Sequence, residues 1–216
     1  FMHKDSIKNI ILVGIGLCVV CGAVISTGAV SLKDQQEQNV IFDQQSKIID
    51  AARLLEVYPS SQEALASIEE VVVNLDEGQA SDFPADQYDL DTILRDSSQH
   101  TVLDGSDDIA MISVRENLSK VYIEYRNNEL KTLILPVRGY GLWGTLYGYL
   151  ALDSDLNTIV GLEFYKHKET PGLGAEVDNP NWKKLWNGKR VYDENGLVQI
   201  SVIKGFSNPE NAEYSY

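Results

Sequence analysis

The longest apolar stretch of the chain lies near its start. Residues 9–32 carry no charged side chain, and Lys8 and Lys33 flank them. A bilayer core is crossed by roughly 20 apolar residues in a helix, so this segment predicts a transmembrane helix over 9–32. A cleaved signal peptide is the alternative, but its apolar core of about 7–15 residues is shorter than this stretch.

The next part of the chain alternates apolar and polar positions at roughly helical spacing. Residues 33–58 contain neither proline nor glycine, which predicts that the span continues as one stalk helix. Within 59–108, a second helix is expected over 60–75, with Ser60 or Ser61 as its N-cap. The remainder of 59–108 is polar, acidic and rich in turn residues, so we expect an irregular excursion there.

From Ile109 the hydrophobic period changes to two, which is typical of strands. The apolar, β-branched and aromatic runs lie at 109–114, 121–125, 130–137, 145–152, 159–165 and 197–203. Short polar links at 126–129 and 153–157 predict hairpins and hence a largely antiparallel sheet. One helix is expected within 178–189, with Asn179 as N-cap, Pro180 in its first turn and Gly188 beyond its end.

These patterns predict an α+β fold. A single N-terminal transmembrane helix is followed by an exported, largely antiparallel sheet domain with flanking helices, and the domain occupies 109–216. Basic residues near the ends of the span set its orientation: Lys4 and Lys8 precede it and Lys33 follows it. We therefore expect residues 1–8 in the cytoplasm and the chain after Leu32 on the other side of the membrane.

Charge and cysteine content exclude several functions. The formal net charge is -14, which disfavours nucleic-acid binding because phosphate contacts require a basic face. Cys18 and Cys21 lie inside the span, where they share one helix face without a further cysteine or histidine nearby, so we predict no metal site and leave their role open. The exported part lacks cysteine, and any electrons it carries must reside on an organic cofactor.

Two glycine-rich stretches are candidates for ligand chemistry. In residues 136–149, Gly139, Gly141 and Gly144 interrupt a strand pattern. Glycine weakens a strand unless a bulge or a close backbone approach requires it. A bulged connection between two strands is the favoured interpretation for these glycines taken alone, and no phosphate-loop motif follows them.

The second stretch is Glu169 to Gly174, directly after an expected strand. Pro171 restricts the backbone around Thr170, while Gly172 and Gly174 permit positive φ and could present bare backbone N–H groups to a ligand. Leu173 between them offers a small apolar platform. A planar, mainly apolar ligand with a polar rim, such as a flavin ring, suits this set, and a purely structural turn is an equal alternative.

Other common kinds of site lack support in the sequence. His3, His100 and His167 are far apart, and no hydrolase motif accompanies them, so we predict no catalytic residue. Basic side chains gather near the end of the helix expected within 178–189. They form either a solvated helix end or a contact for a partner or phosphate.

Several motifs together resemble a known family. PVRGYGLW, then KETPGLGAEVDNPNWKKLWNGK and ISVIKG, resemble the C subunit of bacterial sodium-translocating NADH:quinone reductases, as does the N-terminal KDSIKNIILVGIGLCVVC. The resemblance covers most of the chain and is loosest between residues 59 and 108. The related G subunit of RNF electron-transfer complexes shares the domain and part of these motifs, but the whole E-T-P-G-L-G-A-E-V run fits the reductase family better.

The resemblance implies a flavoprotein electron carrier with FMN bound covalently, as a phosphoester to a threonine in a Ser-Gly-Ala-Thr-type motif. The 216 residues contain no such run, so we expect the attachment residue beyond the end of this chain and the domain to be truncated there. The residues implied to lie against the flavin are Arg138, Gly141, Leu142, Trp143, Glu169, Thr170, Pro171, Gly172, Leu173, Gly174 and Lys204.

The implied function is a membrane-anchored subunit that relays electrons through FMN in a Na+-pumping NADH:ubiquinone reductase and is not active alone. Its expected partners are the other membrane subunits of the complex and the lipid bilayer. Its expected location is the bacterial inner membrane, crossed once, with the C-terminal domain in the periplasm. Two alternatives stay open from the sequence: an electron carrier like the G subunit of an RNF complex, and a cofactor-free membrane-anchored scaffold.

Overall fold

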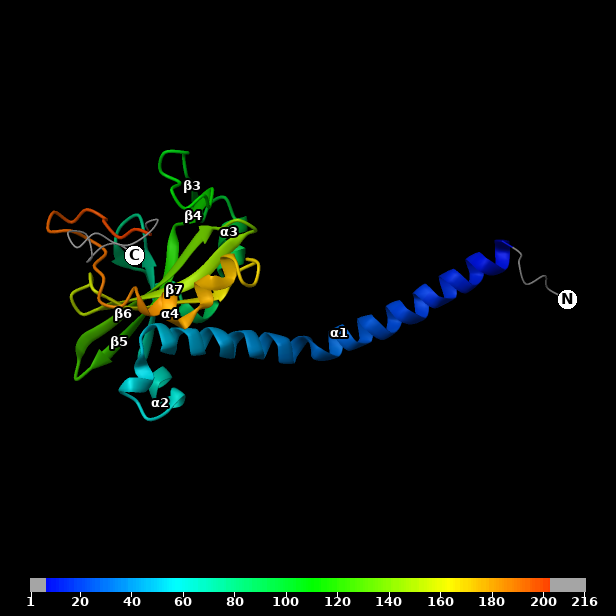
Figure 1. The fold of residues 1–216 in the computed structure, drawn as a ribbon, viewed down its shortest axis with the longest axis horizontal. Helices are drawn as coiled ribbons and strands as arrows, with labels where there is room; N and C mark the ends of the chain where they lie inside the picture. The colour runs from blue at the N-terminus through cyan, green and yellow to red at the C-terminus, as the bar shows by residue number, and fades with distance from the viewer. Residues whose placement is uncertain (1–6, 203–216) are drawn as a thin grey trace. The chain divides into compact units, whose positions relative to one another are not determined.

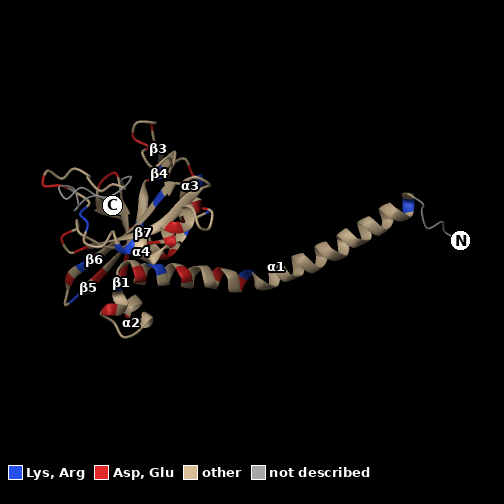
Figure 2. Ribbon diagram, viewed as in Figure 1, with Lys and Arg blue, Asp and Glu red and all other residues tan. Residues whose placement is uncertain are grey.

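A computed structural model describes residues 7–202 of the chain (Figure 1). The chain divides into two units, residues 1–43 and residues 44–216. The first helix, α1, is continuous over Ile7–Ala51 and so belongs to both. Its uncharged part, tan in Figure 2, is long and apolar enough to cross a membrane by length and composition.

The expected continuation of the span as one helix is confirmed, although the helix ends before residue 58. Ala51 is its last residue, and Arg53 then adopts a left-handed conformation with φ 53°. A short 3-10 turn, η1, follows over Leu54–Glu56.

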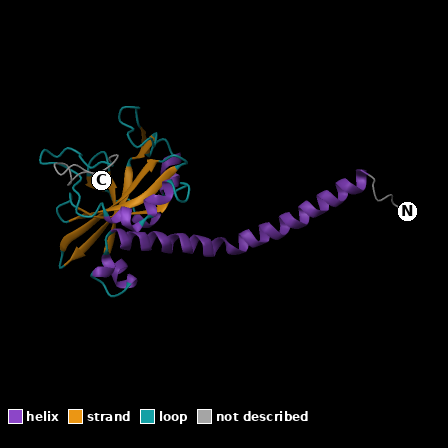
Figure 3. Cartoon of the chain, in the orientation of Figure 1, coloured by secondary structure: helices purple, strands orange, loops and turns teal. Residues whose placement is uncertain are grey.

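The second unit is built on a six-stranded sheet with the order β2-β1-β5-β6-β7-β8 (Figure 3). Every neighbouring pair in it is antiparallel. The strands are β1 (Ile68–Asn74), β2 (Gln79–Ala80), β5 (Leu118–Arg126), β6 (Glu129–Tyr140), β7 (Thr145–Asp153) and β8 (Ile159–Lys166). A separate pair is formed by β3 (His100–Val102) and β4 (Val114–Glu116). The predicted α+β class with a largely antiparallel sheet is confirmed.

Short helical segments accompany the sheet. They are α2 (Ser61–Ala66), η2 (Ala85–Gln87), α3 (Leu90–Arg95), η3 (Gly174–Asp178) and α4 (Pro180–Lys184). At the start of α4, the Asn179 side chain accepts a hydrogen bond from the Asn181 N–H, and Pro180 occupies the first turn. The predicted start of this helix is therefore confirmed. The helix is shorter than expected, because it ends at Lys184 with Leu185 as its C-cap. Gly188 is left-handed with φ 78°, but it lies beyond the cap and its N–H donates to the Ile159 carbonyl oxygen of β8.

The main core forms where the last turns of α1 pack on the sheet. Ile48, Ile49 and Ala51 are buried there and pack in one cluster with Ile134 and Tyr149. The contact between helix and sheet is close. A Cβ on Gly161 would lie 2.4 Å from the Ala51 carbonyl oxygen, so only glycine fits at this point of β8. Burial of this apolar cluster anchors the end of α1 on the sheet.

The helix predicted over 60–75 is wrong for its second half. Ser60 caps α2 through the Glu63 N–H, but Ala66 ends the helix and the following residues form β1. All seven residues of β1 pair with β5, and Val72 is buried. The run of β-branched valines and the tertiary pairing outweigh the helical spacing, so the sheet begins well before residue 109.

Two of the predicted strands are also wrong. Residues 109–113 form a turn, and only Val114 onward pairs, as β4. At 197–203, the described residues up to 202 include the bridge Tyr192↔Val198 and no strand of the sheet. The 126–129 link is confirmed as a tight hairpin: Asn127 and Asn128 both have positive φ, 54° and 61°, as the twist of a two-residue hairpin requires.

The register of β6 defines two ends of the sheet. Thr132 pairs with Glu124 of β5 and with Asp153 of β7, near the 126–129 hairpin. At the other end of β6, Tyr140 pairs with Thr145. The end of β8 lies beside this second end, because Lys166 pairs with Tyr147. Both glycine-rich stretches are therefore brought to the same end of the sheet.

Candidate functional site

The first of these stretches is the connection between β6 and β7. The Gly141 N–H donates to the Gly144 carbonyl oxygen at 2.8 Å, which closes a tight loop. Leu142 and Trp143 lie at its tip and are 78% and 63% exposed. The structural interpretation of these glycines as a connection between strands therefore holds, and the connection also presents two large apolar side chains to solvent.

The second stretch follows β8 and is folded into a compact turn. The Thr170 carbonyl oxygen accepts hydrogen bonds from the N–H groups of Leu173 and Ala175, both at 3.1 Å. Gly172 has φ 75°, and a Cβ built there meets no atom within 4 Å. Leu173 is 73% exposed. The backbone at Gly172 thus faces open space, as a loop that receives a ligand requires.

Glu169 joins the two loops. Its carboxylate Oε1 accepts a hydrogen bond from the Trp143 N–H at 3.0 Å. A Cβ on Gly141 would lie 2.4 Å from Oε1, and a Cβ on Gly174 would lie 2.4 Å from Oε2. The carboxylate is therefore packed between two glycines, one from each loop.

This geometry corrects one expectation from the sequence. Gly174 is not among the residues with positive φ, so backbone freedom is not what requires glycine there. The close approach of the Glu169 side chain requires it instead. Only Gly172 of the pair uses the conformation that glycine permits.

His167 and Asp178 hold the backbone of Glu169 in place through two further contacts. The Glu169 N–H donates to His167 Nδ1 at 3.2 Å, and His167 Nε2 lies 2.7 Å from Asp178 Oδ2. Because Nδ1 accepts a hydrogen bond, the proton of a neutral imidazole belongs on Nε2, from which it is donated to Asp178. Four residues, Asp178, His167, Glu169 and Trp143, are thereby linked in one chain of hydrogen bonds, the loop clamp.

Sequence reasoning missed the role of His167 in the loop clamp. It treated the histidines as isolated, because no motif pairs a histidine with an aspartate eleven positions later. The available indication was the position of His167 two residues before Glu169. In extended chain, residues i and i+2 point to the same face.

Arg138 is engaged elsewhere. Its Nη2 donates to the Val114 carbonyl oxygen and to Glu116 Oε2, both at 2.7 Å. The side chains of Arg138 and Glu116 are both largely buried, so the pair fixes β6 to β4. The structure places its guanidinium on β4 rather than in the loop clamp. Lys204 lies outside the described residues.

The remaining predicted residues lie within the two loops. Leu142, Trp143 and Leu173 provide exposed apolar surface, while Thr170 and Pro171 are exposed in the second loop. Of the basic residues near α4, Lys183 donates to Glu163 Oε2 together with Lys47 of α1. Burial lowers the pKa of Lys47, but the Glu163 carboxylate outweighs this effect and the pKa is raised. Lys183 thus belongs to a structural ion pair.

The fold and these loops match a class of flavin-binding domains. A family of FMN-binding domains matches residues 141–212, a range that includes both glycine loops. Among solved structures, the chain is similar to Shewanella oneidensis NqrC, with a TM-score of 0.70 and 30% identity over 79% of each chain. It is also similar to the C subunit of Na(+)-translocating NADH-quinone reductase from Parabacteroides distasonis, with a TM-score of 0.62 and 27% identity over 86% of this chain and 82% of that one.

Curated relatives of this chain are similar to it over nearly its whole length. The C subunit of the Na(+)-translocating NADH-quinone reductase of Pseudomonas aeruginosa is 42% identical over 99% of this chain and 84% of the relative. Its counterpart from Vibrio vulnificus is 40% identical over 94% of this chain and 80% of the relative. The chain therefore belongs to the NqrC family, the C subunits of Na(+)-translocating NADH-quinone reductases, which confirms the resemblance drawn from its motifs.

Proposed function

We propose that this chain is the FMN-binding, membrane-anchored subunit of a sodium-translocating NADH:quinone reductase, and that it relays electrons between neighbouring subunits. Membership of the NqrC family and the match to FMN-binding domains support this assignment. Both favour it over an RNF-type carrier or a cofactor-free scaffold. The chain is one part of an oxidoreductase complex, and we infer that it does not turn over NADH or quinone alone.

The single structural observation that carries the proposal is the loop clamp. Glu169 joins two loops from the same end of the sheet. The exposed side chains of Leu142, Trp143 and Leu173 stand on these loops. Apolar surfaces with a few fixed polar groups suit a planar ring with a polar rim, so the residues present fit a flavin.

Each group has an expected task when FMN is bound. FMN supplies reversible electron transfer, while the protein orients the ring and tunes its electronics. Leu142, Trp143 and Leu173 would contact the ring and exclude water. Gly172 would allow the backbone to approach it closely. Glu169 would place a negative charge beside the site and hold both loops in position.

The other predicted contacts remain part of this proposal. Gly141 and Gly174 serve it by making room for the Glu169 carboxylate. Thr170 and Pro171 shape the second loop. Arg138 holds β6, the strand that leads into the first loop, on β4 through its ion pair with Glu116. Lys204 stays a prediction from the resemblance.

We further propose that FMN is attached covalently, through its phosphate to a threonine. The net charge of -14 repels a free phosphate, and a tether replaces free binding with a high local concentration. Denaturing electrophoresis of the full-length protein under ultraviolet light tests the attachment. A fluorescent band is expected, whereas a dark band from a yellow preparation would show that the flavin is held noncovalently.

The proposed location is the bacterial inner membrane, with a cytoplasmic N-terminus and the sheet domain in the periplasm. The apolar part of α1 and the larger number of basic residues before it support this orientation. A C-terminal alkaline phosphatase fusion to the full-length protein, which is active only after export, is expected to be active. An inactive fusion would indicate the opposite orientation, with the sheet domain in the cytoplasm.

Glu169→Gln tests the site itself. Loss of one negative charge beside the ring stabilises the reduced form, so the midpoint potential should rise by on the order of tens of millivolts. Glu176→Gln is the matched control, because this exposed carboxylate lies in the same segment but contacts Asn179. Spectroelectrochemical titration of both variants in the assembled complex measures the effect. Unchanged potential and turnover in Glu169→Gln would exclude a role for Glu169.

A further inference from the structure

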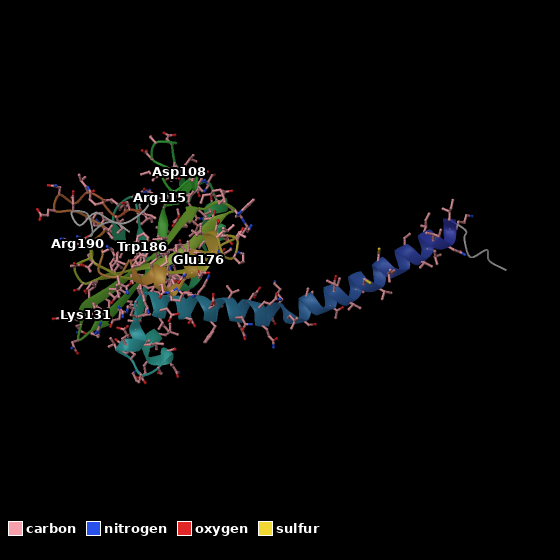
Figure 4. All side chains as sticks on the ribbon, viewed as in Figure 1. Asp108, Arg115, Lys131, Glu176, Trp186 and Arg190 are labelled. Atoms are coloured by element: carbon pink, nitrogen blue, oxygen red, sulfur yellow. The ribbon has the colours of Figure 1, made fainter. Side chains whose placement is uncertain are left out.

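The loop between β3 and β4, residues 103–113, carries an apolar surface that flavin binding does not use. Ile109 is 91% exposed and Met111 is 61% exposed. Figure 1 shows this loop projecting beyond the two strands, and Figure 4 labels Asp108 within it. The Leu103 N–H donates to the Ser113 carbonyl oxygen at 3.0 Å, so the base of the loop is closed.

The loop is held in a conformation that its residues do not favour by themselves. Met111 and Ser113 have φ 51° and 64°, values that are unfavourable for a bulky side chain. The Asp108 carboxylate accepts hydrogen bonds from the N–H groups of Ile112 and Ser113, both at 2.7 Å. The Asp108 N–H in turn donates to the Asp104 carbonyl oxygen. These bonds fix the loop while its two apolar side chains stay in solvent.

The loop lies beside the candidate flavin site. The Ala110 carbonyl oxygen accepts a hydrogen bond from the Tyr140 N–H at 2.8 Å, at the end of β6. A Cβ on Gly139 would lie 3.8 Å from the Ala110 Cβ. Exposed Tyr140 therefore connects the loop to exposed Leu142 at the tip of the β6–β7 connection. A partner that covers Ile109 and Met111 would come next to the site from which electrons leave or arrive.

Charge indicates the chemistry of that partner. Residues 103–113 contain three aspartates and no lysine or arginine, and the acidic loop is visible in Figure 2. An acidic rim around apolar side chains complements a basic rim around an apolar pocket. Anionic lipid headgroups would instead be repelled, so a membrane surface is the less suitable partner.

We propose that residues 103–113 are a docking loop for another protein subunit, one that presents an apolar pocket with a lysine- and arginine-rich rim. The proposal relies on the proposed function for the identity of the complex. Ile109 and Met111 enter the pocket, and the aspartates steer and orient the approach. Asp108 is the positioning residue, because it holds the loop in the docking conformation before contact.

Photo-crosslinking in the intact complex tests the docking loop. A benzophenone amino acid replaces Ile109 in the full-length subunit, within native membranes. Illumination is expected to give an adduct whose mass equals this subunit plus a second protein subunit. A matched probe at Leu156, an exposed residue of the β7–β8 turn at the opposite end of the sheet, should give at least tenfold less of that adduct. A lipid adduct at Ile109, or equal yields at both positions, would overturn the proposal.

Charge variants then test the chemistry of the partner. Asp104→Lys combined with Asp107→Lys leaves the Asp108 bonds in place and should reduce the adduct yield at least fivefold. Raised salt should reduce the yield of the native sequence as well. Asp108→Ala should also lower the yield, and at high salt, where charge steering is screened, it should still do so, because the loop is no longer held by the bonds to the Ile112 and Ser113 N–H groups. Undiminished yield in the double lysine variant would contradict a basic partner surface.

Flavin fluorescence of the same bands separates this proposal from the proposed function. A protein adduct without flavin would contradict FMN binding and still support the docking loop. A flavin-containing subunit without a protein adduct would support FMN binding and overturn the docking loop.

Discussion

The two ends of the six-stranded sheet each carry a glutamate, and the surroundings of the two carboxylates are opposite in kind. Glu124, near the 126–129 hairpin, is 0% exposed. Its carboxylate accepts hydrogen bonds from Tyr58, Arg126 and Thr132. Glu169, beside the β6–β7 tip, is half-buried, and within the described residues its carboxylate accepts one hydrogen bond, from Trp143.

This contrast separates a structural end from the end at which we propose that the ligand binds. A buried carboxylate is tolerated only when hydrogen bonds and an opposite charge compensate it, and Glu124 has both. Glu169 keeps most of its lone pairs and its charge available, and it is held by loops whose large apolar side chains are exposed. The first arrangement stabilises the fold, and the second holds together the two loops of the proposed flavin site.

Replacing the two glutamates by alanine should give the largest difference in stability. Glu124→Ala leaves Arg126, Tyr58 and Thr132 without their acceptor and should lower the free energy of unfolding by about 2–4 kcal/mol. Glu169→Ala removes one hydrogen bond near solvent and should cost less than about 1 kcal/mol. Chemical denaturation of the full chain in detergent measures both. Equal losses would remove the distinction between the two ends.

Alkaline pH should affect the tyrosines that lie between the two ends. Tyr149 stacks on Tyr165, with ring centroids 4.9 Å apart. Burial raises the pKa of both phenols, as it does for Tyr122, and it raises the pKa of Tyr88 to about 12.

The difference in tyrosine pKa between the folded and the unfolded chain determines how stability changes with pH. In the unfolded chain these phenols ionise near pH 10, whereas in the fold they stay protonated, so their stabilisation is present below pH 10 and is lost as pH rises above it. We expect about 1 kcal/mol less stability per tyrosine at pH 11. Absorbance at the phenolate band, recorded during alkaline unfolding, should show these tyrosines ionising with the loss of structure. Ionisation well before unfolding would contradict their burial.

Substitution by alanine should disturb the second loop for different reasons at Gly172 and at Gly174. At Gly172 the positive φ makes alanine unfavourable by about 1 kcal/mol, and the bond between Glu169 and Trp143 is undisturbed. At Gly174 the new Cβ would meet the Glu169 side chain, displace its carboxylate and free the Trp143 N–H. Hydrogen exchange of the Trp143 amide should therefore accelerate in Gly174→Ala alone. Similar exchange in both variants would mean that Glu169 adapts without losing its bond.

The smallest expected effect is in the hairpin at the structural end. Asn128 has φ 61°, which asparagine tolerates better than alanine does. Asn128→Ala should lower the free energy of unfolding by about 0.5–1 kcal/mol, while Asn128→Gly should leave it nearly unchanged. Thermal unfolding of the two variants side by side tests this expectation. A larger loss for glycine than for alanine would contradict the turn geometry.

Prediction from the sequence succeeded where the determining interactions are local. The Asn127-Asn128 turn and the Asn179-Pro180 helix start depend on neighbours within a few residues. It failed at β1, because pairing with β5 joins residues about fifty positions apart. It also failed at 109–113, where Asp108 turns an alternating run into a closed loop. For the site, sequence reasoning selected both glycine loops. It explained Gly174 by backbone freedom rather than by the close approach of Glu169, and it did not predict the contact of His167 with Glu169.

The sequence by itself determined the long apolar stretch of α1, the antiparallel hairpins and the two candidate loops. Composition, hydrophobic period and turn residues are enough for these, because each acts over a short length of chain. Only the tertiary structure decided that Glu169 lies between Gly141 and Gly174, that His167 and Asp178 support it, and that the β3–β4 loop adjoins the site. These contacts join residues distant in sequence, and their geometry follows from strand register and packing, which no local pattern encodes.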